Sequence, residues 1–269
     1  MTLLPSSRDW SLAARDVRKG LLDWQVWGLL ALTDIRQRYT RSRIGQFWIT
    51  LSMALFVGGI GVVYSALFKQ EMSSYLPFLA ANYVVWSTLQ SIVADATTVF
   101  TSSSIYLRQE AMPRTTFVMR LILRNLITFA HNLVIVPFVF LIFAVTPSWT
   151  ILMAIPGVAL LVIAAFPTVM LIGAISTRFR DMPLIIQNLL QVAFFLTPVM
   201  WRPEQLGPAG NYVVGLNPFA VYLRIVSEPL YGRIPGVWTY VAAIICTLVL
   251  YAIASPFMAR FRARIVYWL

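Results

Sequence analysis

Cysteine, histidine and lysine are almost absent from this chain of 269 residues, which contains one Cys, one His and two Lys. A single Cys excludes a disulfide framework, and one Cys with one His excludes a His/Cys metal site. Neither Lys19 nor Lys69 is followed by Ser or Thr, so the chain has no Walker A motif and is not a P-loop ATPase by itself. We therefore expect no catalytic residue, no metal and no cofactor in this chain.

Charged residues are scarce as well. They make up 12% of the chain and hydrophobic residues 59%, whereas soluble domains have about 25% charged and about 45–50% apolar residues. A soluble domain of this length could not bury so much apolar surface, which indicates an all-α, polytopic membrane protein. The ten acidic residues are scattered singly, which disfavours an enzyme that clusters carboxylates around a divalent cation.

Long intervals without Lys, Arg, Asp or Glu indicate where the chain crosses the membrane, since a helix needs about 20 apolar residues to do so. The interval 125–177 is too long for one helix and is divided by a Thr-Pro-Ser-Trp turn at 146–149. Pro and Gly punctuate 202–233, which predicts re-entrant helices there instead of a seventh span. We predict a single transmembrane domain over 1–269 with six transmembrane helices, at about 46–68, 76–98, 122–145, 150–175, 184–200 and 236–258.

The basic residues gather on one side of these predicted spans. Of the 21 Lys and Arg, 17 fall before the first span, after the second, after the fourth or after the sixth. By the positive-inside rule both termini are cytoplasmic. The net charge of +11 is therefore explained by topology and by contact with anionic membrane lipids, and we expect no nucleic-acid partner.

Two cytoplasmic elements combine apolar and charged residues. An N-terminal amphipathic helix is predicted over 20–43, in which Asp34 and Arg38 are spaced for an i,i+4 pair. The loop around Arg108 to Pro113 predicts a short helix parallel to the membrane. Each element has two interpretations. The amphipathic helix is either a membrane anchor alone or an anchor that also docks a cytoplasmic partner. The loop is either a solvated connector or a helix that fits a groove on that partner.

The predicted spans carry rows of aromatic and uncharged polar residues at helical spacing. Such rows either serve hydrogen bonds between helices or line a lumen. Aromatic rings and amides without fixed charge suit a sugar cargo, because the rings contact its C–H groups and the amides bond its hydroxyls. The candidate channel residues on these rows and beside them are Trp48, Phe56, Tyr83, Trp86, Gln187, Gln191, Phe194 and Phe195.

Five short segments, in order and at matching spacing, resemble one known family. They are RYTRSRIGQFW at 38–48, RNLITFAHN at 124–132, RFRDMP at 178–183, FLTPVMW at 195–201 and LNPF at 216–219. With the hydropathy pattern they cover the chain from about residue 20 to its end. The chain resembles the membrane subunits of ABC-2 type polysaccharide exporters, and among these the O-antigen (lipopolysaccharide) export permeases.

The resemblance implies a homodimer of six-helix subunits in the bacterial inner membrane, with two separate nucleotide-binding ATPase subunits that carry ATP and Mg. It implies a polyprenyl-diphosphate-linked glycan as substrate. The outer-gate and coupling assignments rest on this resemblance, and the basic residues near 38–43 are candidates for a diphosphate headgroup or an anionic lipid. The candidates are Arg108, Gln109, Glu110, Met112 and Pro113 for coupling to the ATPase, Arg36, Arg38, Tyr39, Arg41 and Arg43 for the interface helix and headgroup, and Trp201, Asn217 and Pro218 for an outer gate.

Other functions remain open from the sequence. Capsule and teichoic-acid exporters share this architecture, and an ABC-2 permease for small-molecule efflux would share the helices and the partner. A channel or structural membrane protein without an ATPase is the further alternative.

Overall fold

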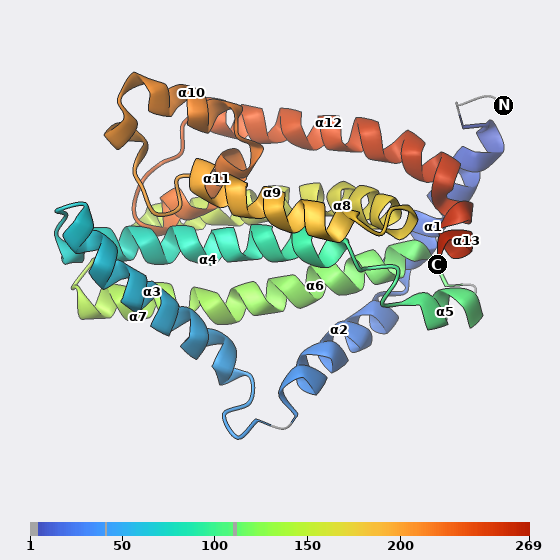
Figure 1. Cartoon of the computed structure of the whole chain (residues 1–269), viewed down its shortest axis with the longest axis horizontal. Coiled ribbons are helices and arrows are strands. Elements are labelled where there is room, and N and C mark those ends of the chain that lie inside the picture. Colours follow the sequence, from blue (N-terminus) through green and yellow to red (C-terminus); the bar gives the residue numbers. More distant parts are fainter. Residues whose placement is uncertain (1–4, 41, 110–111) are drawn as a thin grey trace.

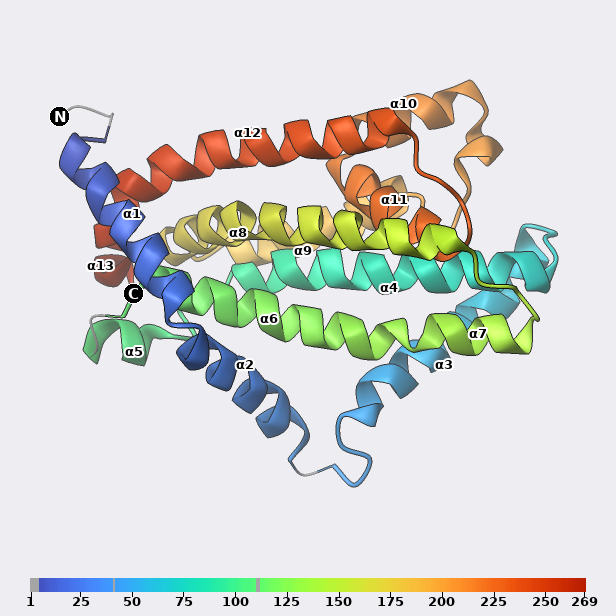
Figure 2. The ribbon, with the colours of Figure 1, turned by 180° about the vertical axis from the view of Figure 1, so that it is seen from behind.

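The computed structural model describes residues 5–40, 42–109 and 112–269, and within them the chain forms helices and turns with no β-strand (Figure 1). Helices α1 (Ser7–Leu22) and α13 (Ile265–Trp268) lie at one end of the molecule, here called the terminal end, and the other end is called the opposite end (Figures 1 and 2). In the described residues, five helical segments are long and apolar enough to cross a membrane, which confirms the all-helical, polytopic prediction. These are α3 (Phe47–Leu67), α4 (Met72–Ala96), α6 (Arg114–Leu133) with α7 (Ile135–Ile142), η1 (Trp149–Met153) with α8 (Ala154–Arg178), and α12 (Val237–Phe261) with η3 (Arg262–Arg264) and α13 (Ile265–Trp268).

Helix α4 forms the core of the bundle. It contacts α3, α6, α7 and α8, and 72% of its apolar window is buried inside the protein. Tyr75 to Asn82 is buried without interruption, as expected for a helix that is apolar on all sides. In contrast, only 17% of the apolar window of α3 and 22% of that of the α12 segment are buried inside the protein. Most of the apolar surface of these two segments is therefore left for lipid or for another chain.

The third predicted span begins earlier than its apolar run. Helix α6 starts at Arg114, eight residues before the predicted start, because the arginines of its first half are paired with carboxylates from other helices. The helix is interrupted at Val134, and Pro137 explains the break, since proline has no N–H to donate to the carbonyl four residues earlier. The segment then continues as α7 to the opposite end.

The fifth predicted span, at about 184–200, is a shorter helix. α9 (Met182–Leu196) has 15 residues, fewer than the roughly 20 needed to cross a membrane as a straight helix. The chain still reaches the opposite end through 197–202, where the Tyr75 hydroxyl donates to the Met200 carbonyl over 2.8 Å and Arg202 donates to the Ser74 carbonyl over 3.1 Å. The described residues therefore hold five long candidate spans and this shorter apolar helix.

The segment after α9 folds into a helical hairpin, which agrees with the prediction of re-entrant helices before the last long helix. It consists of η2 (Pro203–Leu206), α10 (Pro208–Leu216) and α11 (Pro218–Leu230). The turn at Asn217 lies deep in the bundle. This follows from the contact of Phe219, two residues later, with Trp86, which lies about 20 Å along α4 from the start of that helix. Helix α11 is buried between α4, α8 and α12, and it ends near η1, where Thr150 donates to the Pro229 carbonyl.

The N-terminal region contains two helices where the sequence predicted one over 20–43. α1 (Ser7–Leu22) begins at a capping box formed by Ser6 and Asp9, and α2 (Trp24–Tyr39) follows after Asp23. Helix α1 packs across the terminal end against α6 and α12, and α2 packs along α6. A Cβ on Gly20 would lie 2.5 Å from the Thr115 Cβ, which shows how closely α1 approaches α6.

Candidate functional site

Aromatic side chains from four helices meet in one row, here called the aromatic ladder and defined as Phe56, Tyr83, Phe194, Trp86, Phe219 and Phe195. Phe56 of α3 stacks on Tyr83 of α4 with ring centroids 4.3 Å apart, and Tyr83 lies 6.4 Å from Phe194 of α9. Trp86 lies 5.6 Å from both Phe194 and Phe219, the latter on α11. These are spacings at which aromatic pairs attract one another. Of the predicted channel residues, the structure brings together Phe56, Tyr83, Trp86, Phe194 and Phe195, and it adds Phe219.

The aromatic ladder runs from the protein core to its surface. Trp86 is 1% exposed, Phe56 is 39% exposed and Phe195 is 66% exposed. Tyr83 and Phe194 are half-buried between them. Ring contacts thus connect an exposed ring on α3 and an exposed ring on α9 to the buried Trp86 on α4.

The remaining predicted channel residues lie beside the aromatic ladder without joining its ring contacts. Trp48 is 46% exposed near the start of α3, and Gln187 and Gln191 are exposed on α9. The buried side of α9 is formed by Ile186 and Leu190, so both glutamines face away from the α4 packing surface. Their role as channel residues remains a prediction.

The three predicted outer-gate residues are connected to the end of α9. Asn217 caps α11 by accepting from the backbone N–H groups of Phe219 and Ala220, and its amide donates to the Thr197 hydroxyl over 2.9 Å. Pro218 occupies the first turn of α11, a position where proline loses no helical hydrogen bond. Trp201 donates from Nε1 to the Phe195 carbonyl over 3.0 Å. The hairpin turn and the unwound end of α9 are thus one hydrogen-bonded unit.

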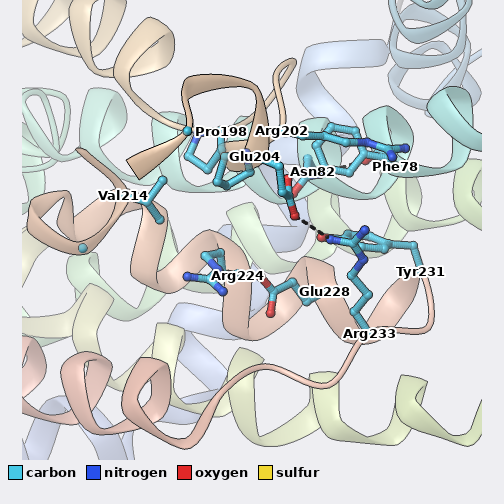
Figure 3. A pocket seen from close by; sticks show the side chains of 13 residues that line it. Phe78, Asn82, Pro198, Arg202, Glu204, Val214, Arg224, Glu228, Tyr231 and Arg233 are labelled. Carbon is cyan, nitrogen blue, oxygen red and sulfur yellow. Dashed lines mark hydrogen bonds and ion pairs between the residues drawn. The ribbon is translucent and has the colours of Figure 1, made fainter. Parts of the chain in front are cut away.

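A pocket of about 380 Å³ lies at the opposite end between α4, η2 and the hairpin (Figure 3). An i,i+4 ion pair joins Arg224 and Glu228 on α11. At the rim Arg233 pairs with Glu204 over 3.4 Å. This pocket was not predicted from the sequence, although the Asn-Pro cap followed by the Arg/Glu spacing is a recognisable helix signal. The lining residues are Phe78, Asn82, Pro198, Arg202, Pro203, Glu204, Gly207, Val214, Gly215, Arg224, Glu228, Tyr231 and Arg233.

At the terminal end, Asp16 of α1 caps a helix that begins 98 residues later. Its buried carboxylate accepts from the backbone N–H groups of Arg114 and Thr115 over 3.2 and 3.1 Å, and from the Thr115 hydroxyl over 2.9 Å. Arg114 and Arg262 lie 3.9 and 3.5 Å from the same carboxylate. Asp16 therefore joins α1, the start of α6 and the end of α12. Helix α1 was not predicted from the sequence, although Ser6 and Asp9 match the capping-box spacing.

A second ion-pair network joins α2, α4 and α6. Asp34 accepts from Arg120 through two guanidinium nitrogens and from Arg124 over 3.3 Å, so the predicted pair with Arg38 is wrong. The partner of Asp34 comes from a different helix, a long-range contact that i,i+4 spacing cannot anticipate. Arg124 also pairs over 2.8 Å with Asp95, which lies at the end of α4.

Arg38 lines a polar pocket of about 240 Å³ beside this network. Arg36 and Arg43 are exposed on the same part of the chain, and Tyr39 is half-buried. Arg41 lies outside the described residues. Of the predicted headgroup residues, Arg36, Arg38 and Arg43 are thus exposed, and Arg38 lies beside the paired Arg120 and Arg124.

The predicted coupling loop is exposed at its start and buried at its end, where it joins α6. In α5 (Ser104–Gln109), Leu107 is buried while Arg108 and Gln109 are exposed. Met112 is half-buried, and Pro113 is buried as the N-cap residue of α6, next to the backbone groups that Asp16 caps. Glu110 lies outside the described residues.

Comparison with known families decides the class of this protein. The profile of the ABC-2 type transporter family matches residues 25–231, which include the aromatic ladder, the Asp34 network and the hairpin. The chain belongs to the ABC-2 type transporter family. As an ABC-2 membrane protein it is the membrane-spanning part of a transporter and is not itself an enzyme.

Two O-antigen export system permease proteins, both called RfbA, are similar to this ABC-2 protein. The protein from Klebsiella pneumoniae is 21% identical over 189 residues, which are 70% of this chain and 73% of the relative. The protein from Myxococcus xanthus is 21% identical over 244 residues, which are 88% of this chain and 94% of the relative. The likeness thus extends over nearly the whole length of the Myxococcus protein.

Proposed function

We propose that this chain is the permease subunit of an ATP-driven transporter that exports a polyprenyl-diphosphate-linked O-antigen across the bacterial inner membrane. The ABC-2 family match and the likeness to two O-antigen export permeases support a transport role of this kind. The structural observation that supports a glycan as cargo is the exposed side of the aromatic ladder.

The aromatic ladder suits a sliding polysaccharide because its rings offer apolar faces to sugar C–H groups without a fixed charge that would hold the chain in one place. Its exposed rings need a covering surface to form a closed path. Exposed apolar residues on α3 and α9, such as Leu55 at 65% and Leu189 at 61%, support a second copy of this chain as that cover. In this proposal the two copies form a homodimer, and Trp48, Gln187 and Gln191 extend the path along α3 and α9.

The energy for export comes from two copies of a separate ATPase subunit, which carry ATP and Mg. Arg108 and Gln109 on the exposed side of α5, with Glu110, Met112 and Pro113, are the proposed contact with that subunit. A push on α5 reaches α6 through Pro113 and reaches α1 and α12 through Asp16. Both termini are cytoplasmic in this proposal, which agrees with the common position of α1 and α13 at the terminal end.

The diphosphate headgroup of the lipid-linked glycan enters near Arg36, Arg38, Tyr39, Arg41 and Arg43. Arg38 supports this role, because it lines a polar pocket in which the two neighbouring arginines are already paired with Asp34 and Asp95. Asn217, Pro218 and Trp201 form the proposed outer gate, since the hairpin turn and the end of α9 are linked by hydrogen bonds.

Deletion of the gene with complementation tests the function. Loss of surface O-antigen, with lipid-linked glycan accumulating on the inner side of the membrane, is expected after deletion, and the wild-type gene restores export. Phe194→Ala should lower export while Phe138→Ala, on an exposed face of α7 outside the aromatic ladder, should leave it unchanged. Normal surface glycan together with new sensitivity to a toxic compound would contradict the proposal and favour small-molecule efflux. Loss of a capsule or teichoic acid instead would keep the transporter class and change the cargo.

A further inference from the structure

The pocket at the opposite end contains charges that are costly to keep at such a position. Glu228 is 9% exposed on α11, a helix buried among α4, α8 and α12, and its partner Arg224 is on the same helix. Burying a carboxylate is costly even when it is paired, because the hydration that it loses can outweigh the attraction to its partner. The Arg224 side chain is still 35% exposed, so its guanidinium can be reached from the pocket.

Hydrogen-bond donors exceed acceptors in this pocket. Arg202 uses one terminal nitrogen for the Ser74 carbonyl, and its buried Nε has no partner among the described residues. Arg224 bonds Glu228 through Nε, which leaves its terminal nitrogens for a ligand. With Arg233, three guanidinium groups face two carboxylates, those of Glu204 and Glu228 (Figure 3).

The walls of the pocket combine these donors with aromatic surface. Phe78 and Tyr231 line it, and Arg202 lies 5.1 Å from the Phe78 ring centroid. Paired guanidinium and carboxylate groups bind vicinal hydroxyls, since one donates and the other accepts, and the surplus guanidinium favours a carboxylate on the ligand. At about 380 Å³ the pocket is in the range of small-molecule sites.

We propose that this pocket binds one pyranose unit of the emerging glycan and prefers a uronic acid to the neutral sugar. The proposal rests on the proposed function, because it takes the ligand to be part of the exported polymer. The rim pair Glu204–Arg233 joins η2 to the segment after α11 and stands at the mouth of the pocket. A bound sugar therefore contacts both ends of the re-entrant hairpin.

Saturation-transfer NMR on the full chain in nanodiscs tests the site with two matched probes, methyl α-glucopyranoside and methyl α-glucopyranosiduronate. Both should receive saturation, and the uronate should bind about tenfold more tightly, as one additional charge-assisted hydrogen bond predicts. The variant Arg202→Gln removes one guanidinium and leaves two, those of Arg224 and Arg233, opposite the carboxylates of Glu204 and Glu228. It should abolish the preference and weaken the uronate, whereas Arg15→Gln, an exposed change on α1, should alter neither.

Each other result overturns the proposal. Absence of saturation for both probes, equal affinities in the wild type, or a preference that survives in Arg202→Gln would each do so. Binding of sn-glycerol 3-phosphate in place of both glycosides would identify a phospholipid headgroup as the ligand. Export in the deletion and complemented strains is measured separately. Normal rescue without glycoside binding therefore refutes the pocket alone, while unaltered surface glycan after deletion refutes the proposed function.

Discussion

Replacing Asp16 by Ala removes the carboxylate that joins three helices at the terminal end. Loss of an N-cap costs about 1 kcal/mol of unfolding free energy. Leaving Arg114 and Arg262 without this partner costs about 2 kcal/mol more. This is below the roughly 3–5 kcal/mol lost when a fully buried pair is broken, because both arginines are partly exposed and lie 3.9 and 3.5 Å from the carboxylate. At about 2–4 °C for each kcal/mol, the expected fall in Tm is about 6–12 °C.

The single cysteine makes this measurement direct. Cys246 is half-buried in α12, so a thiol-reactive fluorophore reports its exposure as the purified protein unfolds in detergent. Asp16→Asn keeps an acceptor for Thr115 and should fall between the wild type and Asp16→Ala. Asp23→Asn is the matched control, since its side chain makes no hydrogen bond among the described residues. A Tm for Asp16→Ala within about 2 °C of the wild type would refute the assignment of Asp16 as a junction.

Three further changes test the packing of the bundle and its N-terminal cap. Gly157→Ala should lower Tm by the equivalent of about 1–3 kcal/mol, because its Cβ would lie 2.4 Å from the backbone oxygen of Ile225. Gly58→Ala, where a Cβ would meet open space, should not lower Tm. Equal shifts in the two variants would contradict the α8–α11 contact. Tyr75→Phe should cost about 1 kcal/mol by removing the 2.8 Å hydrogen bond to the Met200 carbonyl, and an unchanged Tm would show that this bond does not hold 197–202. Hydrogen bonds from the backbone and side chain of Ser6 hold the pKa of Asp9 below its ordinary value of 3.8. The ionised Asp9 should therefore stabilise the start of α1 above this pH, and that stabilisation should be lost as the pH falls below it. Amide exchange in α1, corrected for intrinsic rates, should show this pH dependence in the wild type and not in Asp9→Asn.

The long apolar helices could be predicted from the sequence because lipid removes most alternatives for the backbone. The aromatic convergence could be predicted in part, since Tyr83, Phe56 and Phe194 lie on rows with helical spacing that the structure brings into contact. Phe219 was not among the candidates, because its place depends on how deeply the hairpin turn enters the bundle.

Long-range ion pairs account for most of what the sequence did not predict. Asp16 and Asp34 bind arginines 86 to 246 residues away, and no local spacing encodes such partners. The early start of α6 follows from the same cause, since Arg114 and Arg120 become tolerable inside a long apolar segment only once these carboxylates are placed. Helix α9 was predicted too long because Pro198 and the hydrogen bonds of Thr197 end it before its apolar run ends.

The re-entrant hairpin has a consequence for how this chain is inserted into a membrane. Because α10 enters the bundle from the opposite end and α11 returns toward that same end, the pair adds no net crossing. The direction of α12 is therefore set by the helices before the hairpin, and lengthening or deleting the hairpin should leave the C-terminus on the same side of the membrane. A change in the length of the hairpin therefore does not by itself reverse the topology of the helices that follow it.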